Sequence, residues 1–81
     1  MTNEWTVNQR KVRVVKTDGG ARLFVDDQLL DATNDLYASG DEPTLAGAFG
    51  DTIVEAFVKP IGEAAIRVNG EYVTAAYAAA S

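Results

Sequence analysis

The chain has 81 residues, of which 47% are hydrophobic and 23% charged, and its formal net charge is −5. This length and composition predict one globular domain over 1–81 rather than a disordered chain. The absence of cysteine and histidine excludes disulfides, thiolate metal sites and the commonest general base.

Targeting features are also missing from the sequence. No apolar run approaches the ~20 residues of a membrane-spanning helix. The opening residues, MTNEWTVNQRK, lack the apolar core of a signal peptide. We therefore expect a cytoplasmic location and no membrane partner.

The charges are distributed unevenly along the chain. Residues 1–22 contain five of the seven cations but only two of the twelve carboxylates. We interpret this asymmetry as an ordinary solvated surface with two differently charged ends, because an acidic chain repels phosphate backbones overall. The alternative is a polyanion-binding patch, which such asymmetry can mark. If a polyanion binds, the predicted contacts are Arg10, Lys11, Arg13, Lys16 and Arg22.

The strand pattern begins near the N-terminus. Trp5 and Val7 alternate with polar residues and indicate an additional N-terminal strand. Six further segments combine alternation with bounding turn residues. These predicted strands cover 11–16, 21–25, 28–32, 53–58, 64–68 and 71–75.

An internal repeat relates these six strands. Residues 11–32 align without gaps on 54–75 at an offset of 43, with six of the 22 positions identical. Asn69-Gly70 is a strong hairpin signal because both residues tolerate the positive φ of a type I′ turn, and Asp26-Asp27 occupies the matching place. Four-residue loops are predicted at 17–20 and 60–63.

These turns fix a register for each copy. The predicted inward rows are Val14–Leu23–Leu30 and Phe57–Ile66–Val73, with Val12, Val25 and Val68 on the same faces and Glu55 near a sheet margin. The predicted outward pairs are Phe24–Leu29 and Arg22–Asp31 in one copy, and Arg67–Tyr72 and Ala65–Thr74 in the other.

The fold class that follows is all-β. Each copy is expected to form a three-stranded antiparallel meander with one apolar face, and the two faces pack with pseudo-twofold symmetry as a small sandwich or barrel. Within the connector 33–53, Glu42, Pro43 and Gly50 predict one short helix over 43–50. An extended strand at 44–48 is the alternative.

The outward face of the first copy contains the most informative anomaly. Val15, Phe24 and Leu29 form an apolar patch on a face that should be polar, which is typical of a partner or self-association site. The alternative is that Trp5, residues 43–50 or Tyr37 cover this patch.

The remaining polar clusters indicate no catalytic, metal or cofactor site. The oxygen-rich stretches 31–35 and 39–42 lack the spacing of an EF-hand loop. Asp26 and Asp27 are adjacent at a hairpin tip, where their carboxylates splay apart. Such a tip offers neither the burial nor the shared site that acid–base catalysis by a carboxylate pair requires. Gly19-Gly20 lacks the surrounding pattern of a phosphate-binding loop.

The sequence therefore predicts a small non-enzymatic binding or protein-interaction module that self-associates as a homodimer or larger assembly. One alternative is a nucleic-acid-binding β-barrel that uses the basic N-terminal strand, although we do not expect nucleic acid to be the main partner. The other is an enzyme that works with carboxylates and a divalent cation.

Overall fold

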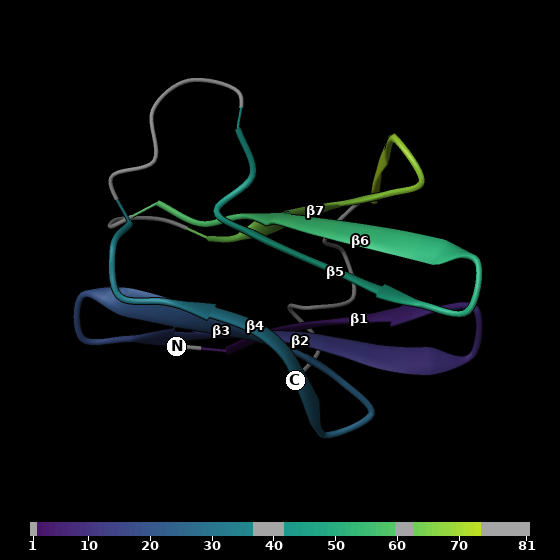
Figure 1. The fold of residues 1–81 in the computed structure, drawn as a ribbon, viewed down its shortest axis with the longest axis horizontal. Helices are drawn as coiled ribbons and strands as arrows, with labels where there is room; N and C mark the ends of the chain where they lie inside the picture. Colours follow the sequence, from purple (N-terminus) through teal and green to yellow (C-terminus); the bar gives the residue numbers. More distant parts are fainter. Residues whose placement is uncertain (1, 37–41, 60–62, 74–81) are drawn as a thin grey trace.

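The computed structural model describes residues 2–36, 42–59 and 63–73, which form eight strands and no helix. The strands make two four-stranded antiparallel sheets, sheet A in the order β1-β2-β3-β4 and sheet B in the order β5-β6-β7-β8. The sheets lie as two layers, one above the other in Figure 1. The strands are β1 Thr2–Val7, β2 Arg10–Thr17, β3 Gly20–Val25, β4 Gln28–Thr33, β5 Leu45–Phe49, β6 Thr52–Phe57, β7 Ala65–Val68 and β8 Glu71–Val73.

The all-β class and the packing of two antiparallel meanders are confirmed, but each sheet has four strands rather than three. The expected N-terminal strand is β1, which pairs with β2. The other additional strand is β5, in the connector. No segment within the described ranges forms a helix long and apolar enough to cross a membrane.

Tight turns explain why neighbouring segments pair. The predicted two-residue hairpin turns at Asp26-Asp27 and Asn69-Gly70 are confirmed, and the expected four-residue loop at 17–20 closes further, into a two-residue turn that keeps the predicted register. Type I′ turns require positive φ at both central residues. Three turns meet this requirement, at Asn8 (50°) and Gln9 (67°), Asp26 (49°) and Asp27 (68°), and Asn69 (48°) and Gly70 (86°).

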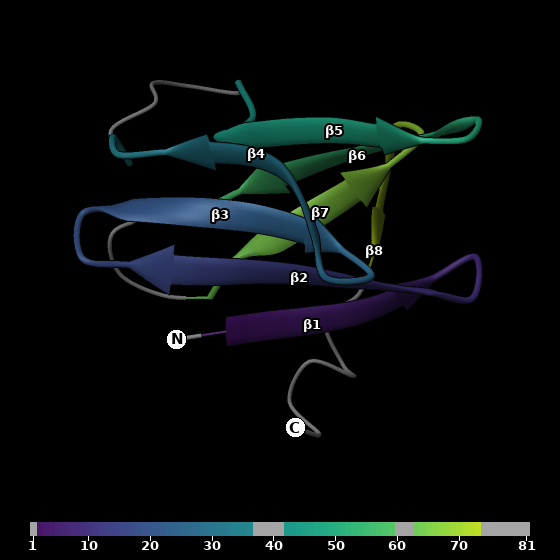
Figure 2. The ribbon, with the colours of Figure 1, turned by 60° about the horizontal axis from the view of Figure 1, so that its bottom comes forward.

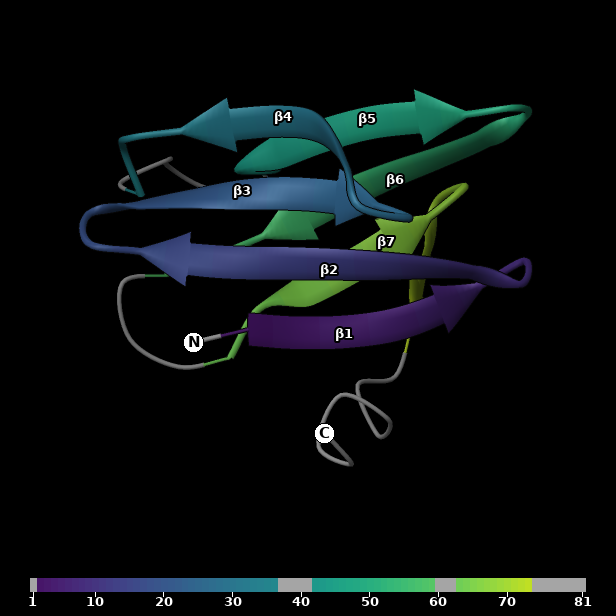
Figure 3. The same ribbon diagram turned by 90° about the horizontal axis from the view of Figure 1, so that it is seen from below.

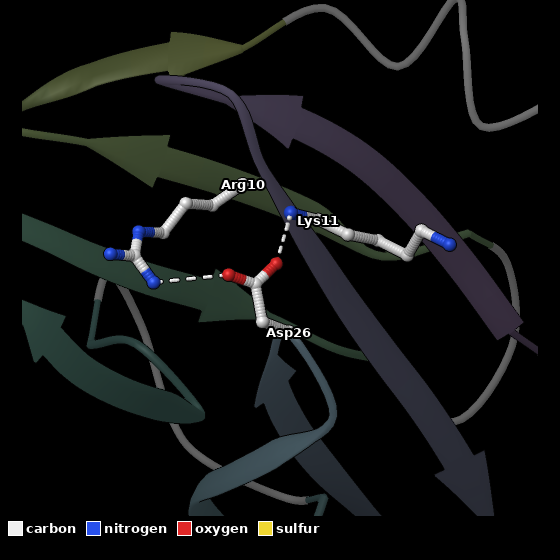
Figure 4. A network of polar contacts seen from close by, with 3 residues as sticks. All are labelled: Arg10, Lys11 and Asp26. Atoms are coloured by element: carbon white, nitrogen blue, oxygen red, sulfur yellow. Dashed lines mark hydrogen bonds and ion pairs between the residues drawn. The ribbon is translucent and has the colours of Figure 1, made fainter.

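Asp26 and Asn69 have the same additional function at the ends of their strands. The backbone N–H of Asp26 donates to the Lys11 carbonyl at 2.9 Å. Asp26 Oδ1 in turn accepts from the Lys11 N–H, also at 2.9 Å (Figure 4). Asn69 makes the same two bonds with Ile53, again at 2.9 Å. The side-chain oxygen thus takes the place of a backbone carbonyl, and the ladder continues one residue into the turn.

We expect Asp26→Ala to lower the free energy of unfolding by about 2 kcal/mol. About 1 kcal/mol comes from the lost hydrogen bond, and about 1 kcal/mol from placing alanine at positive φ. Urea denaturation measures this change. Asp26→Asn is the matched control, because Asn69 makes equivalent bonds in sheet B; equal losses in both variants would contradict the role assigned to the side-chain oxygen.

The core lies between the inner faces of the two sheets. Leu23 and Ile66 are fully buried, as predicted, while Phe24 and Arg67 on the neighbouring positions are half-buried and face outward. Alternation therefore assigns the inner and outer faces of β2, β3 and β7 correctly. The largest fully buried side chains are Trp5, Val12, Val14, Leu23, Leu45, Val54 and Ile66.

The predicted pairing of β3 with β4 is wrong beyond the first two pairs. Phe24 faces Leu29 as expected, but a bulge then places Leu23 opposite Asp31 rather than Leu30. Arg22 consequently faces Ala32 rather than Asp31. The bulge adds one unpaired residue to β4, so Leu30 still packs against the core without a direct partner.

The predicted register of β6 is wrong by one residue. Ala56, not Phe57, faces Ile66, and Phe57 faces Ala65 on the outer side of sheet B. Leu23 of β3 corresponds to Ile66 of β7, an offset of 43 residues, but their partners Val14 of β2 and Ala56 of β6 are only 42 residues apart. The gapless alignment of the two copies therefore fails at β6. Glu55 therefore does not lie near the sheet margin as predicted, because it faces Arg67 in the middle of the outer face.

The helix predicted over 43–50 is a strand. β5 pairs with β6 from Leu45 opposite Ala56 to Phe49 opposite Thr52, and Gly50 opens a tight turn instead of ending a helix. The predicted turn residues 60–62 and the predicted strand end 74–75 lie outside the described residues.

The two sheets meet along β4 and β5, which lie side by side in Figures 2 and 3. The backbone N–H of Ala46 donates to Asp31 Oδ2 at 3.0 Å. A Cβ atom on Gly47 would lie 2.7 Å from Leu30 Cβ, so only glycine leaves room for the leucine here. Side chains from β4 therefore close this side of the sandwich onto β5.

Candidate interaction faces

The structure brings together the apolar residues predicted on the outer side of sheet A. Phe24 lies directly opposite Leu29, and Val15 lies one strand away, opposite Arg22. Leu29 is 50% exposed, while Val15 and Phe24 are half-buried. Trp5 lies in the core and does not cover this patch, β5 belongs to sheet B, and Tyr37 lies outside the described residues.

Arg13 gives this patch a mixed character. Its guanidinium carbon lies 5.0 Å from the centroid of the Phe24 ring, and its Nη2 atom lies 2.8 Å from Asp27 Oδ1. A guanidinium over an aromatic face is attractive and covers part of the ring. Phe24 is consequently shielded on one side, and Leu29 is the most accessible apolar side chain of the group.

The five cations predicted to bind polyanions do not share one surface. Lys11, Arg13 and Arg22 alternate with inward residues and point outward from sheet A. Arg10 lies at the β1–β2 turn, where it pairs with Asp26 at 3.0 Å and lies 5.6 Å from the Phe49 ring. Lys16 occupies the inward row at the opposite end of β2.

We call the outer side of sheet A face A. Lys11 and Arg22 have no carboxylate within ion-pair distance among the residues that the structure describes. The acidic neighbours are Glu4 of β1, which lies opposite Arg13, and Asp27, which pairs with Arg13. Face A is therefore an apolar centre whose border has three cations and two carboxylates, and it consists of Glu4, Lys11, Arg13, Val15, Arg22, Phe24, Asp27 and Leu29.

The outer side of sheet B, which we call face B, is a second apolar surface that the sequence reasoning missed. Ile53 is 54% exposed and Tyr72 is 66% exposed. The Phe57 and Tyr72 rings are 5.7 Å apart, and the exposed alanines of β5 lie opposite Glu55 and Ile53. Face B consists of Ala46, Ala48, Ile53, Glu55, Phe57, Arg67 and Tyr72.

An ion pair lies at the centre of face B. Arg67 Nε is 2.8 Å from Glu55 Oε1, and the guanidinium carbon lies 5.2 Å from the Phe57 ring and 5.7 Å from the Tyr72 ring. The predicted contact between Arg67 and Tyr72 is confirmed. The hydrogen bond from Arg67 lowers the pKa of Glu55; desolvation opposes this shift, and the positive charge of Arg67 adds to it. The hydrogen bond to the Glu55 carboxylate in turn raises the pKa of Arg67.

We expect an NMR titration to give Glu55 a pKa below its ordinary value of 4.5. Because the folded pKa is the lower one, the pair stabilises the fold fully above the unfolded pKa and loses this contribution as the pH falls through the folded pKa. Arg67→Gln should return the pKa of Glu55 towards 4.5. An unchanged pKa in that variant would contradict the assigned cause.

Three other carboxylates near these faces, those of Asp26, Asp27 and Asp31, are held in structural contacts. Asp26 binds Arg10 and the Lys11 N–H, whereas Asp27 binds Arg13, so the adjacent pair is split between different partners. Asp31 accepts from the N–H groups of Ala32 and Ala46. No group of three or more acids within the described ranges gathers as a cation site.

Comparison with known proteins identifies no relative. No protein-family model, no curated protein and no solved structure matches the chain. The two outer faces are therefore the features of the molecule that bear on its function.

Proposed function

We propose that this protein is a non-enzymatic interaction module that self-associates through face A, with Val15, Phe24 and Leu29 at the centre of the contact. The observation that carries the proposal is the half-exposed Leu29 next to Phe24 on a sheet face. Contiguous exposed apolar groups inside a polar border are typical of protein contacts.

The size of the chain supports the same proposal. A domain of about this length buries only roughly 60% of the surface exposed by its unfolded chain, so an additional contact contributes substantially to its stability. Cysteine is absent, so no disulfide supplies this stabilisation. Apolar surface removed from water between copies would supply it.

The test is Leu29→Lys, measured by light scattering on size-exclusion fractions over a concentration series. The wild type should associate as its concentration rises into the high micromolar range, and the variant should remain monomeric because its lysine would need to be desolvated in the contact. Gln28→Lys is the matched control, since it adds the same charge one residue away on the exposed start of β4.

A wild type that stays monomeric over the whole series would refute the proposal, as would Leu29→Lys that associates like the wild type. Far-ultraviolet circular dichroism checks that both variants fold. Because Leu29 is half-exposed and contributes little to the core, we expect neither lysine to unfold the chain.

A further inference from the structure

Face A is poorly suited to contact a second copy of itself. Lys11, Arg13 and Arg22 surround its apolar centre, and two of these three have no carboxylate partner among the described residues. A symmetric contact uses the same patch on both copies, so it would bring these cations together as water is removed. Like charges placed opposite each other disfavour association.

Face B has the complementary properties. Its one arginine is already neutralised by Glu55, and its exposed apolar groups are Ile53 and Tyr72. The described part of the surrounding half, 42–59 and 63–73, contains five carboxylates and two cations, a balance of −3, whereas 2–36 contains six carboxylates and five cations, a balance of −1. Two of the carboxylates, Asp51 and Glu71, are exposed in or next to the hairpin turns that border the face.

The two faces also point in opposite directions. Sheets A and B pack through their inner sides, so face A and face B lie on opposite sides of the molecule (Figure 1). A copy that uses face A for one neighbour therefore keeps face B available for another. Such a head-to-tail contact leads to rings or open chains rather than a closed dimer.

From this charge complementarity we infer that face A of one copy binds face B of the next, with Leu29 packed against the surface around Ile53 and Tyr72. This inference depends on the proposed function, because it names the partner of the same face. The cations of face A then lie near the acidic border of face B, where they attract instead of repel.

A mixing experiment tests the inference with two variants of the full chain. Leu29→Lys blocks face A, and Ile53→Lys blocks face B, at side chains that are 50% and 54% exposed. Each variant alone should be monomeric. An equal mixture should form one-to-one pairs and stop there, because each pair retains only blocked faces, whereas the wild type should exceed the mass of a dimer.

The outcomes separate this inference from the proposed function. If Ile53→Lys associates like the wild type while Leu29→Lys is monomeric, face A binds itself; the inference is then wrong and the proposed function stands. If Leu29→Lys associates and Ile53→Lys does not, the proposed function is wrong. A mixture that remains monomeric also overturns the inference. Leu29→Ser and Tyr72→Lys replace any variant that circular dichroism shows to be unfolded.

Discussion

Replacing Trp5 with alanine should lower the free energy of unfolding by about 3–5 kcal/mol, the usual cost of emptying a large aromatic site in a core. Trp5 is 1% exposed and lies on β1 opposite Val12, between the two sheets. Small domains have total stabilities of about 5–15 kcal/mol, so most of the stability would be lost. Urea denaturation followed by circular dichroism measures the change, since Trp5 is the sole tryptophan.

Trp5→Phe is the control for this prediction. The Trp5 indole nitrogen has no hydrogen-bond partner among the described residues, so phenylalanine removes volume but no polar contact. We expect it to cost less than half as much as alanine. Equal losses for the two variants would contradict the view that Trp5 acts by filling the core.

The second large effect is expected at Gly47, where a valine should destabilise the fold by about 3 kcal/mol. Strand positions ordinarily favour β-branched residues over glycine, so a glycine-to-valine substitution in a strand usually stabilises the fold. At position 47 we expect the opposite effect. The reason is steric, because the added Cβ would lie 2.7 Å from Leu30 Cβ and 2.8 Å from Leu30 Cδ1. Overpacking of this kind typically costs ~1–3 kcal/mol.

A double-mutant cycle isolates that contact. Leu30→Ala removes the outer atoms that a valine at 47 would meet, so the double variant should be less destabilised than the sum of the two single variants. The stabilities of all four proteins by urea denaturation give the coupling. Simple additivity would show that Gly47 is required for a reason other than the leucine.

The parts of the fold that the sequence predicted are those decided by local chemistry. Asp26-Asp27 and Asn69-Gly70 tolerate positive φ between apolar runs, and this alone fixed the start of both final hairpins. Alternation then placed Leu23 and Ile66 inside. The same alternation predicts Phe24 and Leu29 side by side on the outer side of sheet A, where the structure has them.

The parts that failed depend on contacts between distant residues. The identities Val15/Val58 and Lys16/Lys59 favoured an offset of 43 for β6, although the structural offset is 42. That error put Phe57 in the core and Glu55 at a margin. Together with the helix predicted over 43–50, it concealed face B, because no local feature reveals that Gly47 makes room for Leu30.

The order of the strands has a consequence for how quickly the chain folds. In both sheets every hydrogen-bonded strand pair joins neighbours along the chain, and β-hairpins closed by short turns form within about 1–10 μs. The slow event should be the meeting of the two preformed halves, which brings partners as remote as Asn3 and Ala64 together. Substitutions in the turns should therefore act mainly on the rate of refolding, and substitutions between the layers mainly on the rate of unfolding.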